Sequence, residues 1–487
     1  MRPSRLLRAM LHGLIPALAL FATVVQGAEK IPVTTGSKEA LAAFQEGRAL
    51  FDNLRLTDAL PYFQKAVDRD GSFALAHLYL AQAAPTAKVF FAELNKADET
   101  SAKASKGEQL YIKAFKAGAY ADQSTSLRLY KELVEAFPGD ERAQTLLGTT
   151  YFAQQDYVQA AEHLKKATEL APDYGPAYNQ LGYVYRFLQR YDDAEKTFKK
   201  YTELLPTDPN PFDSYAELLL KMGRFDESIT QYQKALAVNP HFVNSMVGIA
   251  SCLMYENRHD EALEELQKMY DMARNDGEKR FALFSRSVVY QDEGKPAEAI
   301  AEVEKEHAIA EKTNDAASMS GDLALIANIL LNDGRADEAL AKFKESDQVI
   351  QKSSLAKQVK ENNALLNEFN FARVYIAQGD LAKAKAVTKT FWKEVEASKN
   401  KNQMRLAHEL AGMIAFHEKE YGKASDELLQ ANQQDPNVLY HLALAFQGSG
   451  KADEAKKFAS AAAKFNALPI MRLAYVRTKA EKLLEAL

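Results

Sequence analysis

Residues Glu141 to Phe242 carry one pattern three times, at a strict period of 34 residues. The first copy reads Leu147-Gly148, Tyr151, Ala160, Leu164, Ala167 and Pro172. The second copy reads Leu181-Gly182, Tyr185, Ala194, Phe198, Tyr201 and Pro206. The third, looser copy reads Tyr215-Ala216, Leu219, Ser228, Tyr232, Ala235 and Pro240. A fixed period of this length predicts an array of equal structural units.

Each copy contains two apolar helical periods separated by a short polar turn, which is Gln189 to Asp193 in the second copy. Gly182 is small where two helices must approach closely, and Phe198 is large enough to fill the space beside it. Pro206 ends the second helix, because proline has no N–H and disfavours helix in the residue before it. One such hairpin cannot bury its apolar stripe alone, so the pattern predicts a stack of hairpins.

The three copies resemble the tetratricopeptide repeat (TPR), whose signature is L-G-x2-Y, then A-x3-F, then P. The resemblance implies an all-α fold, namely a right-handed α-solenoid of antiparallel helix hairpins, the TPR superhelix. It also implies a scaffold that binds other molecules, and it leaves the identity of the ligand open.

The resemblance covers most of the chain and implies a TPR or TPR-like solenoid over residues 37–465. It is strongest over 141–242, and it weakens over 85–110, where Pro85 comes early and two irregular helices are expected. After residue 242 the register continues through Ala250 and Leu266, and the spacing then lengthens to intervals of 37 to 45 residues, which predicts longer helices or longer connections. Residues 466–487 are expected to form a C-terminal capping helix over the last repeat, with a dimerisation helix as the alternative.

The first 27 residues have the features of a secretory signal peptide. Arg2, Arg5 and Arg8 form a basic start, and Leu14 to Val25 is an apolar run. Cleavage before Ala28 would leave residues 28–36 as an extended lead-in and no membrane span. This predicts export to a periplasmic or extracellular space; the alternative is an uncleaved membrane anchor, for which the apolar run is short.

Charge and cysteine content narrow the possible partners. The formal net charge is −5, and removal of residues 1–27 would leave 58 basic and 66 acidic residues, a net charge of −8. An acidic chain argues against nucleic acid as a partner. Cys252 is the only cysteine, so the chain has no internal disulfide, and its apolar neighbours predict a buried side chain.

The sequence contains partial motifs for catalysis or metal binding, but each lacks a residue that the motif requires. Gly448-Ser449-Gly450-Lys451 is similar to part of a phosphate-binding loop, but Ala445 and Ala452 stand where that motif needs Gly and Ser or Thr. His417-Glu418 has no second histidine at the spacing of metalloproteases. We therefore expect no enzyme activity, no cofactor and no metal site.

The binding surface is predicted from the repeat geometry. On the first helix of the second copy, several side chains face away from the partner helix, and the TPR resemblance places such positions along the concave groove. The candidate partner-binding residues, rich in aromatics with one arginine, are Phe152, Asn179, Tyr183, Arg186, Phe187 and Tyr255. The alternative is that several of them pack between adjacent repeats.

The sequence thus predicts a non-catalytic exported TPR scaffold that binds a protein or peptide through its concave face. Two alternatives stay open. One is a polysaccharide-associated TPR protein of the cell envelope, because aromatic grooves also stack on sugars. The other is an accessory subunit of a secreted enzyme complex.

Overall fold

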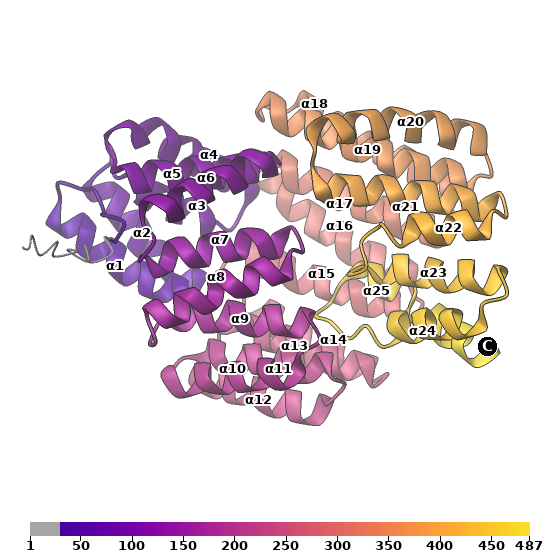
Figure 1. Ribbon diagram of the computed structural model, residues 1–487, viewed down its shortest axis with the longest axis horizontal. Helices are drawn as coiled ribbons and strands as arrows, with labels where there is room; N and C mark the ends of the chain where they lie inside the picture. The colour runs from indigo at the N-terminus through magenta and orange to yellow at the C-terminus, as the bar shows by residue number, and fades with distance from the viewer. Residues whose placement is uncertain (1–29) are drawn as a thin grey trace, which may run out of the picture.

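The computed structural model describes residues 30–487, and the signal-peptide prediction falls on residues 1–27, outside that range. Within the described part of the chain the regular secondary structure is helical, with no β-strand (Figure 1). Residues 30–36 are extended, and Ser37 caps the first helix through its side chain. None of the helices in this range combines the length and the apolar character needed to cross a bilayer.

The helices of the first half follow one another as hairpins of similar size. These hairpins are α1 (Lys38–Asp52) with α2 (Leu56–Arg69), α3 (Ala74–Gln82) with α4 (Ala87–Thr100), α5 (Lys106–Ala119) with α6 (Gln123–Ala136), α7 (Glu141–Ala153) with α8 (Tyr157–Leu170), α9 (Gly175–Phe187) with α10 (Tyr191–Leu204), α11 (Pro209–Lys221) with α12 (Phe225–Val238), and α13 (Val243–Tyr255) with α14 (His259–Met272). Pro172, Pro206 and Pro240 lie just after α8, α10 and α12, as the repeat pattern predicts.

The second half continues with further hairpins, and the first three of them have longer helices. The hairpins of this half are α15 (Asp276–Asp292) with α16 (Pro296–Lys312), α17 (Ala316–Asn332) with α18 (Ala336–Lys352), α19 (Lys357–Ala377) with α20 (Leu381–Ser398), α21 (Lys401–His417) with α22 (Tyr421–Leu428), and α23 (Pro436–Gly448) with α24 (Ala452–Ala463). Helices α15 to α18 have 17 residues each and α19 has 21, against 13 or 14 for α7 to α14. The wider sequence spacing beyond residue 266 therefore comes largely from longer helices.

Close packing inside each hairpin explains the small residues of the repeat. A Cβ atom built on Gly182 would lie 2.6 Å from two ring atoms of Phe198, which is fully buried. In the hairpins from α7 to α14 a left-handed residue lies in the turn after the first helix, with φ of 61° at Gln155, 58° at Gln189, 75° at Gly223 and 59° at Asn257. Short turns of this type fold each second helix back on the first, which gives the helical solenoid that the sequence predicts.

Residues 85–110 depart from the regular repeat in a defined way. Helix α4 pairs with α3 and is followed by a 3-10 turn, Ser101–Lys103, before α5 begins. Helix α4 also packs on α17, more than two hundred residues further along the chain. The irregular stretch therefore lies where the solenoid meets its own second half.

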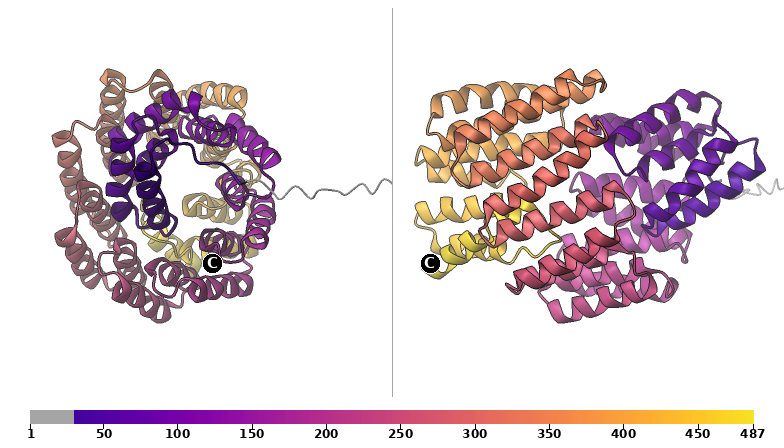
Figure 2. Two further views of the ribbon diagram at one scale, coloured as in Figure 1. Left: turned by 90° about the vertical axis from the view of Figure 1, so that its left-hand side faces the viewer. Right: turned by 180° about the vertical axis from the view of Figure 1, so that it is seen from behind.

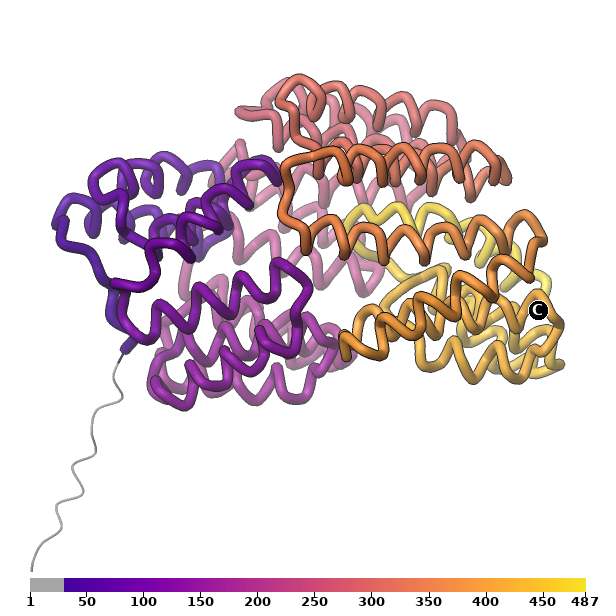
Figure 3. The backbone as a smooth tube through the Cα atoms, turned by 90° about the horizontal axis from the view of Figure 1, so that it is seen from above, coloured from indigo at the N-terminus to yellow at the C-terminus, as the bar shows by residue number. Residues whose placement is uncertain are grey.

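The solenoid turns back on itself, so that the two halves of the chain touch (Figures 2 and 3). In the end view the helices surround a common axis, with the N-terminal and C-terminal repeats at opposite ends of the molecule. Arg274 pairs with Asp58 at 2.6 Å, and Thr57 Oγ1 donates a hydrogen bond to Glu278 Oε1 at 2.9 Å.

The second seam of contact joins the middle repeats to residues beyond 400. Arg405 Nη2 donates to the carbonyl oxygen of Gln154 at 3.0 Å. Gln155 Nε2 donates to Asn432 Oδ1 at 2.7 Å, and Asn400 Nδ2 donates to the carbonyl of Ala121 at 3.0 Å. These contacts hold successive superhelical turns together.

The segment after the last hairpin has two parts. Helix α26 (Arg477–Ala486) packs on α24 of the last hairpin, at the end for which the sequence predicts a cap. Before it, residues 464–476 run back past the earlier repeats, and the short helix α25 (Met471–Ala474) packs on α15. Met471, Tyr475 and Val476 are buried in the same core cluster as residues of α13, α15 and α17.

Candidate functional site

A cavity of about 700 Å³ lies where the middle repeats meet the C-terminal segment. One wall comes from the ends of α7, α9 and α11 and from the turns that follow α7 and α9. The other wall comes from α23, α24 and the segment leading to α25. The aromatic and basic side chains that line the cavity include Phe152, Tyr157, Arg186, Phe187, Lys221, Lys457, Phe458, Lys464 and Phe465.

The 34-residue period places a row of equivalent residues beside this cavity. Ala153, Phe187, Lys221 and Tyr255 are the last residues of α7, α9, α11 and α13. Ala153, Phe187 and Lys221 line the cavity, and Tyr255 meets the C-terminal segment beyond it. Since equivalent residues of a solenoid lie on one continuous face, this row forms a single edge of the inner helices.

Three aromatic side chains form one side of the cavity. The ring centroids of Phe152 and Phe187 lie 5.0 Å apart in an edge-to-face arrangement. Tyr157, the first residue of α8, stacks on Phe187 with a centroid separation of 5.3 Å and an interplanar angle of 18°. These rings are only partly buried, so they offer apolar surface to a ligand.

Arg186 lies between this aromatic cluster and the buried carboxyl group of Glu217. Its guanidinium lies 5.1 Å from the ring centroid of Phe187 and forms an ion pair of 3.2 Å with Glu217. Burial raises the pKa of Glu217, and burial together with Glu217 raises the pKa of Asp213. Ser245 Oγ donates a hydrogen bond of 2.7 Å to Asp213 Oδ1. Arg186 is thus held in place by the carboxylate of Glu217.

Lys221 is the partly buried lysine of the site, and it has no carboxylate partner among residues 30–487. Its ammonium donates to the carbonyl oxygen of Phe465 and lies 4.1 Å from the ring centroid of the same residue. Burial, reinforced by the charge of Arg186, lowers the pKa of Lys221 to about 8. A partly buried ammonium without a counterion favours an anionic group nearby.

The C-terminal segment is fixed to the inner row by further contacts. Ala467 N donates to the Tyr255 hydroxyl at 3.1 Å, and that hydroxyl donates to the Ala467 carbonyl. Arg477 donates to Asp292 at 2.7 Å through Nε and to Asn257 at 3.0 Å. The chain therefore covers part of its own inner face.

The structure separates the six candidate residues into two groups. Phe152, Arg186 and Phe187 line the cavity. Tyr183 is half-buried, with its ring 5.4 Å from that of Phe198, and it is not among the lining residues. The expectation of an exposed groove position is wrong for Asn179 and Tyr255, which are 3% and 9% exposed. Neighbouring repeats bury Asn179, and the C-terminal segment covers Tyr255.

Sequence reasoning missed Lys221, Tyr157 and the whole C-terminal wall. A signal existed for Lys221, because it follows Phe187 by one 34-residue period. No comparable signal exists for Phe465, whose place depends on the path of a segment outside the repeats. Cys252 is buried as predicted, and burial raises the pKa of its thiol to about 12.

The described residues contain no cluster of three or more His, Cys, Asp or Glu side chains able to hold a metal ion. The cavity instead combines aromatic rings with four basic side chains, Arg186, Lys221, Lys457 and Lys464. No aspartate or glutamate occurs among the residues that line it. The arrangement is suited to holding a ligand that is partly apolar and negatively charged.

Comparison with known proteins identifies the repeat. Residues 140–207 match one tetratricopeptide-repeat family model, and residues 44–87 and 216–278 match a second model of the same description. These ranges include the first two copies of the 34-residue pattern and the third copy from Ala216 onward, and they reach the first hairpin. No curated protein matches the chain at a significant level.

Three solved structures illustrate the similarity. A TPR protein of Thermus thermophilus is 26% identical, covering 44% of this chain and 98% of that chain, with a TM-score of 0.29. A TPR protein from Parabacteroides merdae is 18% identical, covering 54% of this chain and 98% of its own, with a TM-score of 0.36. YrrB, described as a TPR protein with an unusual peptide-binding site, is 19% identical, covering 37% of this chain and 91% of its own, with a TM-score of 0.26.

Proposed function

Because the chain is a tetratricopeptide-repeat protein, we propose that it is a non-catalytic, exported scaffold that binds a protein or peptide partner at the edge of its concave face. Tetratricopeptide repeats support a role in protein–protein interaction. The proposal that the partner binds at this edge rests on the 700 Å³ cavity beside the row Ala153, Phe187 and Lys221. Its volume lies within the range of about 300–1,000 Å³ typical of ligand sites.

The charges at the cavity support a partner segment with acidic residues. The whole chain is acidic, with a net charge of −5, whereas the lining holds four basic side chains and no acidic one. Lys457 and Lys464 are exposed, and neither forms an ion pair within the described residues. Complementary charge would steer an acidic segment to the cavity and fix its orientation there.

The aromatic rings support an apolar or aromatic side chain next to those acidic residues. Phe152, Tyr157 and Phe187 stand together on one wall, and Phe458 and Phe465 contribute to the opposite wall. Partly exposed aromatic clusters are typical of contact surfaces. A short acidic peptide with one bulky apolar residue could place its carboxylates near the basic side chains and its apolar residue against the aromatic rings.

Export belongs to the proposal and is supported by the sequence alone. The basic start at Arg2, Arg5 and Arg8 and the apolar run Leu14 to Val25 have the order of a signal peptide. On this proposal the mature scaffold acts in the periplasm or outside the cell.

A peptide library screened against the purified protein tests the proposed site. We expect the selected peptides to be enriched in Asp and Glu next to an apolar residue. The variant with both Lys457→Glu and Lys464→Glu should bind the selected peptides at least about tenfold more weakly, because two cations become anions. Both side chains are exposed, so the fold should be unaffected.

Lys456→Glu is the matched control, because Lys456 is exposed on the same helix but does not line the cavity. It should bind the peptides like the wild type. Equal loss of binding in the control and in the double variant would contradict the proposed site. Binding to a glycan array without any peptide selection would instead support the polysaccharide-associated alternative.

A further inference from the structure

A second cavity, of about 220 Å³, lies between the inner helices of the second half and the C-terminal helices. Its walls come from the ends of α17, α19 and α21, from α23, from Tyr475 and Val476 between α25 and α26, and from α26. The polar residues that matter here are Asn332, Arg373, Tyr440, His441, Tyr475 and Lys479. No aspartate or glutamate lines this cavity.

Arg373 is the central charge of the second cavity. Its guanidinium donates to Asn328 Oδ1 at 2.7 Å, and no carboxylate within residues 30–487 forms an ion pair with it. The carboxylates of Glu409 and Asp435 pair instead with Arg472, at 2.5 and 2.6 Å. Burial, reinforced by Arg472, lowers the pKa of Arg373. A neutral amide oxygen satisfies one of the five N–H donors and none of the charge.

Tyr475 provides a second, independent indication of a ligand. Its side chain lines the cavity and is 6% exposed, yet its hydroxyl has no hydrogen-bond partner in the described part of the chain. Buried hydroxyls are normally paired, so an unpaired one beside a cavity needs an explanation. A ligand oxygen within the cavity would accept a hydrogen bond from this hydroxyl.

Lys479 is an exposed residue that lines the cavity and adds a further positive charge to it. Its ammonium donates to Asn332 Oδ1 at 2.9 Å. Like Arg373, Lys479 has no carboxylate partner among residues 30–487. The two cations therefore flank the cavity without a counterion of the protein.

We propose that this cavity binds a small oxyanion, a carboxylate or phosphate group, whose oxygens accept hydrogen bonds from the Arg373 guanidinium and the Tyr475 hydroxyl. A volume of 220 Å³ is below the range of drug-sized ligands and suits a compact group. Guanidinium is the side chain best matched to carboxylate and phosphate, because its planar N–H groups can bind two oxygens at once. This site shares no residue with the partner-binding cavity and does not depend on it.

Calorimetry and thermal unfolding of the full mature chain test the proposal. Inorganic phosphate, sulfate and acetate are added separately, with sodium chloride at equal ionic strength as the reference. We expect at least one of the three anions to bind in a saturable way and to raise the unfolding temperature above the chloride reference. Preference for phosphate and sulfate would assign a tetrahedral group, and preference for acetate would assign a carboxylate.

Arg373→Gln should weaken this binding by about tenfold or more, as expected for loss of a charged hydrogen-bond donor. Tyr475→Phe should weaken it several-fold while leaving the unliganded protein as stable as the wild type, because the hydroxyl that is removed has no partner within the described residues. If Arg373→Gln unfolds the protein, Tyr475→Phe and Lys479→Gln test the proposal in its place.

Two exposed lysines of α26 give a matched pair of controls. Lys479→Gln should weaken the binding, whereas Lys482→Gln should leave it unchanged, because Lys482 does not line the cavity. The proposal is overturned if no anion exceeds chloride at equal ionic strength. It is equally overturned if Tyr475→Phe and Lys479→Gln bind as tightly as the wild type.

Discussion

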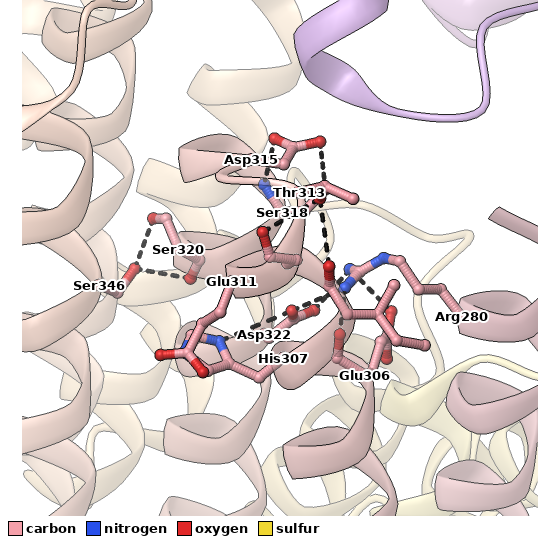
Figure 4. A network of polar contacts seen from close by, with 12 residues as sticks. Arg280, Glu306, His307, Glu311, Thr313, Asp315, Ser318, Ser320, Asp322 and Ser346 are labelled. Carbon is pink, nitrogen blue, oxygen red and sulfur yellow. Dashed lines mark hydrogen bonds and ion pairs between the residues drawn. The ribbon is translucent and has the colours of Figure 1, made fainter. Parts of the chain in front are cut away.

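Arg280 binds Asp322 through two parallel hydrogen bonds, from Nη1 at 2.9 Å and from Nη2 at 2.8 Å (Figure 4). The same guanidinium lies 3.0 Å from the carboxyl of Glu306, so one cation faces two acidic groups. Both acids are buried, and their residues are 3% and 7% exposed. Because a single guanidinium cannot compensate two buried negative charges, one of the acids must hold a proton more tightly than it does in water.

The pKa of Glu306 rises to about 8, because burial and the neighbouring Asp322 both disfavour its charged form. Since its ordinary value is 4.5, the folded chain keeps a proton between about pH 5 and pH 8 that the unfolded chain has lost. Stability should therefore fall as the pH rises through this window. Glu306→Gln keeps the neutral shape, so it should match the wild type near pH 5 and exceed it by a few kcal/mol near pH 9, at about 1.4 kcal/mol per pKa unit.

Hydrogen exchange of α15, α16 and α17 measures this difference locally, which suits a solenoid that need not unfold as one unit. Glu311→Gln is the control, because Glu311 is an exposed neighbour whose change should not alter the pH profile between 5 and 9. A wild-type profile that rises with pH over this window would show that Glu306 is ionised in the folded chain.

The close contact between Gly182 and Phe198 predicts a local defect when the glycine is enlarged. A side chain at Gly182 would meet ring atoms at 2.6 Å, and the buried ring cannot move away. Gly182→Leu should destabilise α9 and α10 by about 1–3 kcal/mol through overpacking. Hydrogen exchange should show opening there first, with α21 and α22 still protected.

Gly321→Ala is the matched control, because a Cβ at this helical position has no atom within 4 Å and φ is not positive. It should leave stability unchanged or raise it by up to about 1 kcal/mol through higher helix propensity. Uniform loss of protection along the chain in Gly182→Leu would contradict the nearest-neighbour coupling of a solenoid.

The repeat pattern predicted the fold because packing inside a hairpin is local. Gly182, Phe198 and Pro206 report on contacts within about thirty residues, and each lies where the period indicates. The same period placed Phe187 at the end of an inner helix, beside the cavity. Local rules therefore sufficed for the helices, for the turns and for half of the candidate site.

The other half depends on contacts between distant parts of the chain, which no periodic pattern encodes. Phe465 reaches Lys221, and Ala467 reaches Tyr255, because the C-terminal segment leaves the last hairpin and runs back along the solenoid. Burial of Tyr255 is a consequence of that path. Polar contacts between residues more than two hundred positions apart help to fix the path of the segment. The residue types that form these contacts occur throughout the chain, so they give no signal in the sequence.

The different surroundings of Tyr183 and Phe187 predict different effects of truncating them. Phe187 lines the cavity and stacks on Tyr157, so Phe187→Ala should weaken binding of library-selected peptides by about 2 kcal/mol or more. Tyr183 packs on Phe198 within its own hairpin, and its hydroxyl donates to Ser214 of the next hairpin at 3.4 Å, so Tyr183→Ala should reduce stability more than it reduces binding. Peptide titration together with thermal unfolding of each variant separates the two effects. The reverse assignment would place the binding surface at Tyr183.

Export predicts a defined N-terminus. The basic start and short apolar run before Ala28 should direct cleavage after Gly27. Intact-mass measurement of the protein purified from its native host should give a chain that begins at or near Ala28. Changing Arg2, Arg5 and Arg8 to Glu should slow processing, whereas Arg48→Gln, within the first repeat, should not affect it. Recovery of the full-length chain in a membrane fraction would contradict cleavage.

The buried pair of Arg477 and Asp292 predicts that this contact contributes strongly to holding the C-terminal segment in place. Arg477 is 5% exposed and Asp292 is 6% exposed, and the guanidinium donates to the carboxylate through two nitrogens, with 2.7 Å for Nε. Removing one partner leaves a buried charge unpaired, so Arg477→Met should destabilise the docked segment by about 3–5 kcal/mol. Hydrogen exchange of residues 464–487 should then rise well before that of α7 to α10.

The double variant Arg477→Met with Asp292→Leu tests whether the segment is held by the pairing of two buried charges or by the packing of its apolar side chains. Replacing both partners removes the unpaired charge and keeps apolar volume, so protection of residues 464–487 should return close to the wild-type level. His259, whose Nε2 lies 3.0 Å from Asp292, would lose that contact at little cost, since it remains partly exposed. Additive losses from the two changes would mean that Arg477 and Asp292 act independently. The docked position of the segment would then depend on Met471, Tyr475 and Val476 in the apolar core.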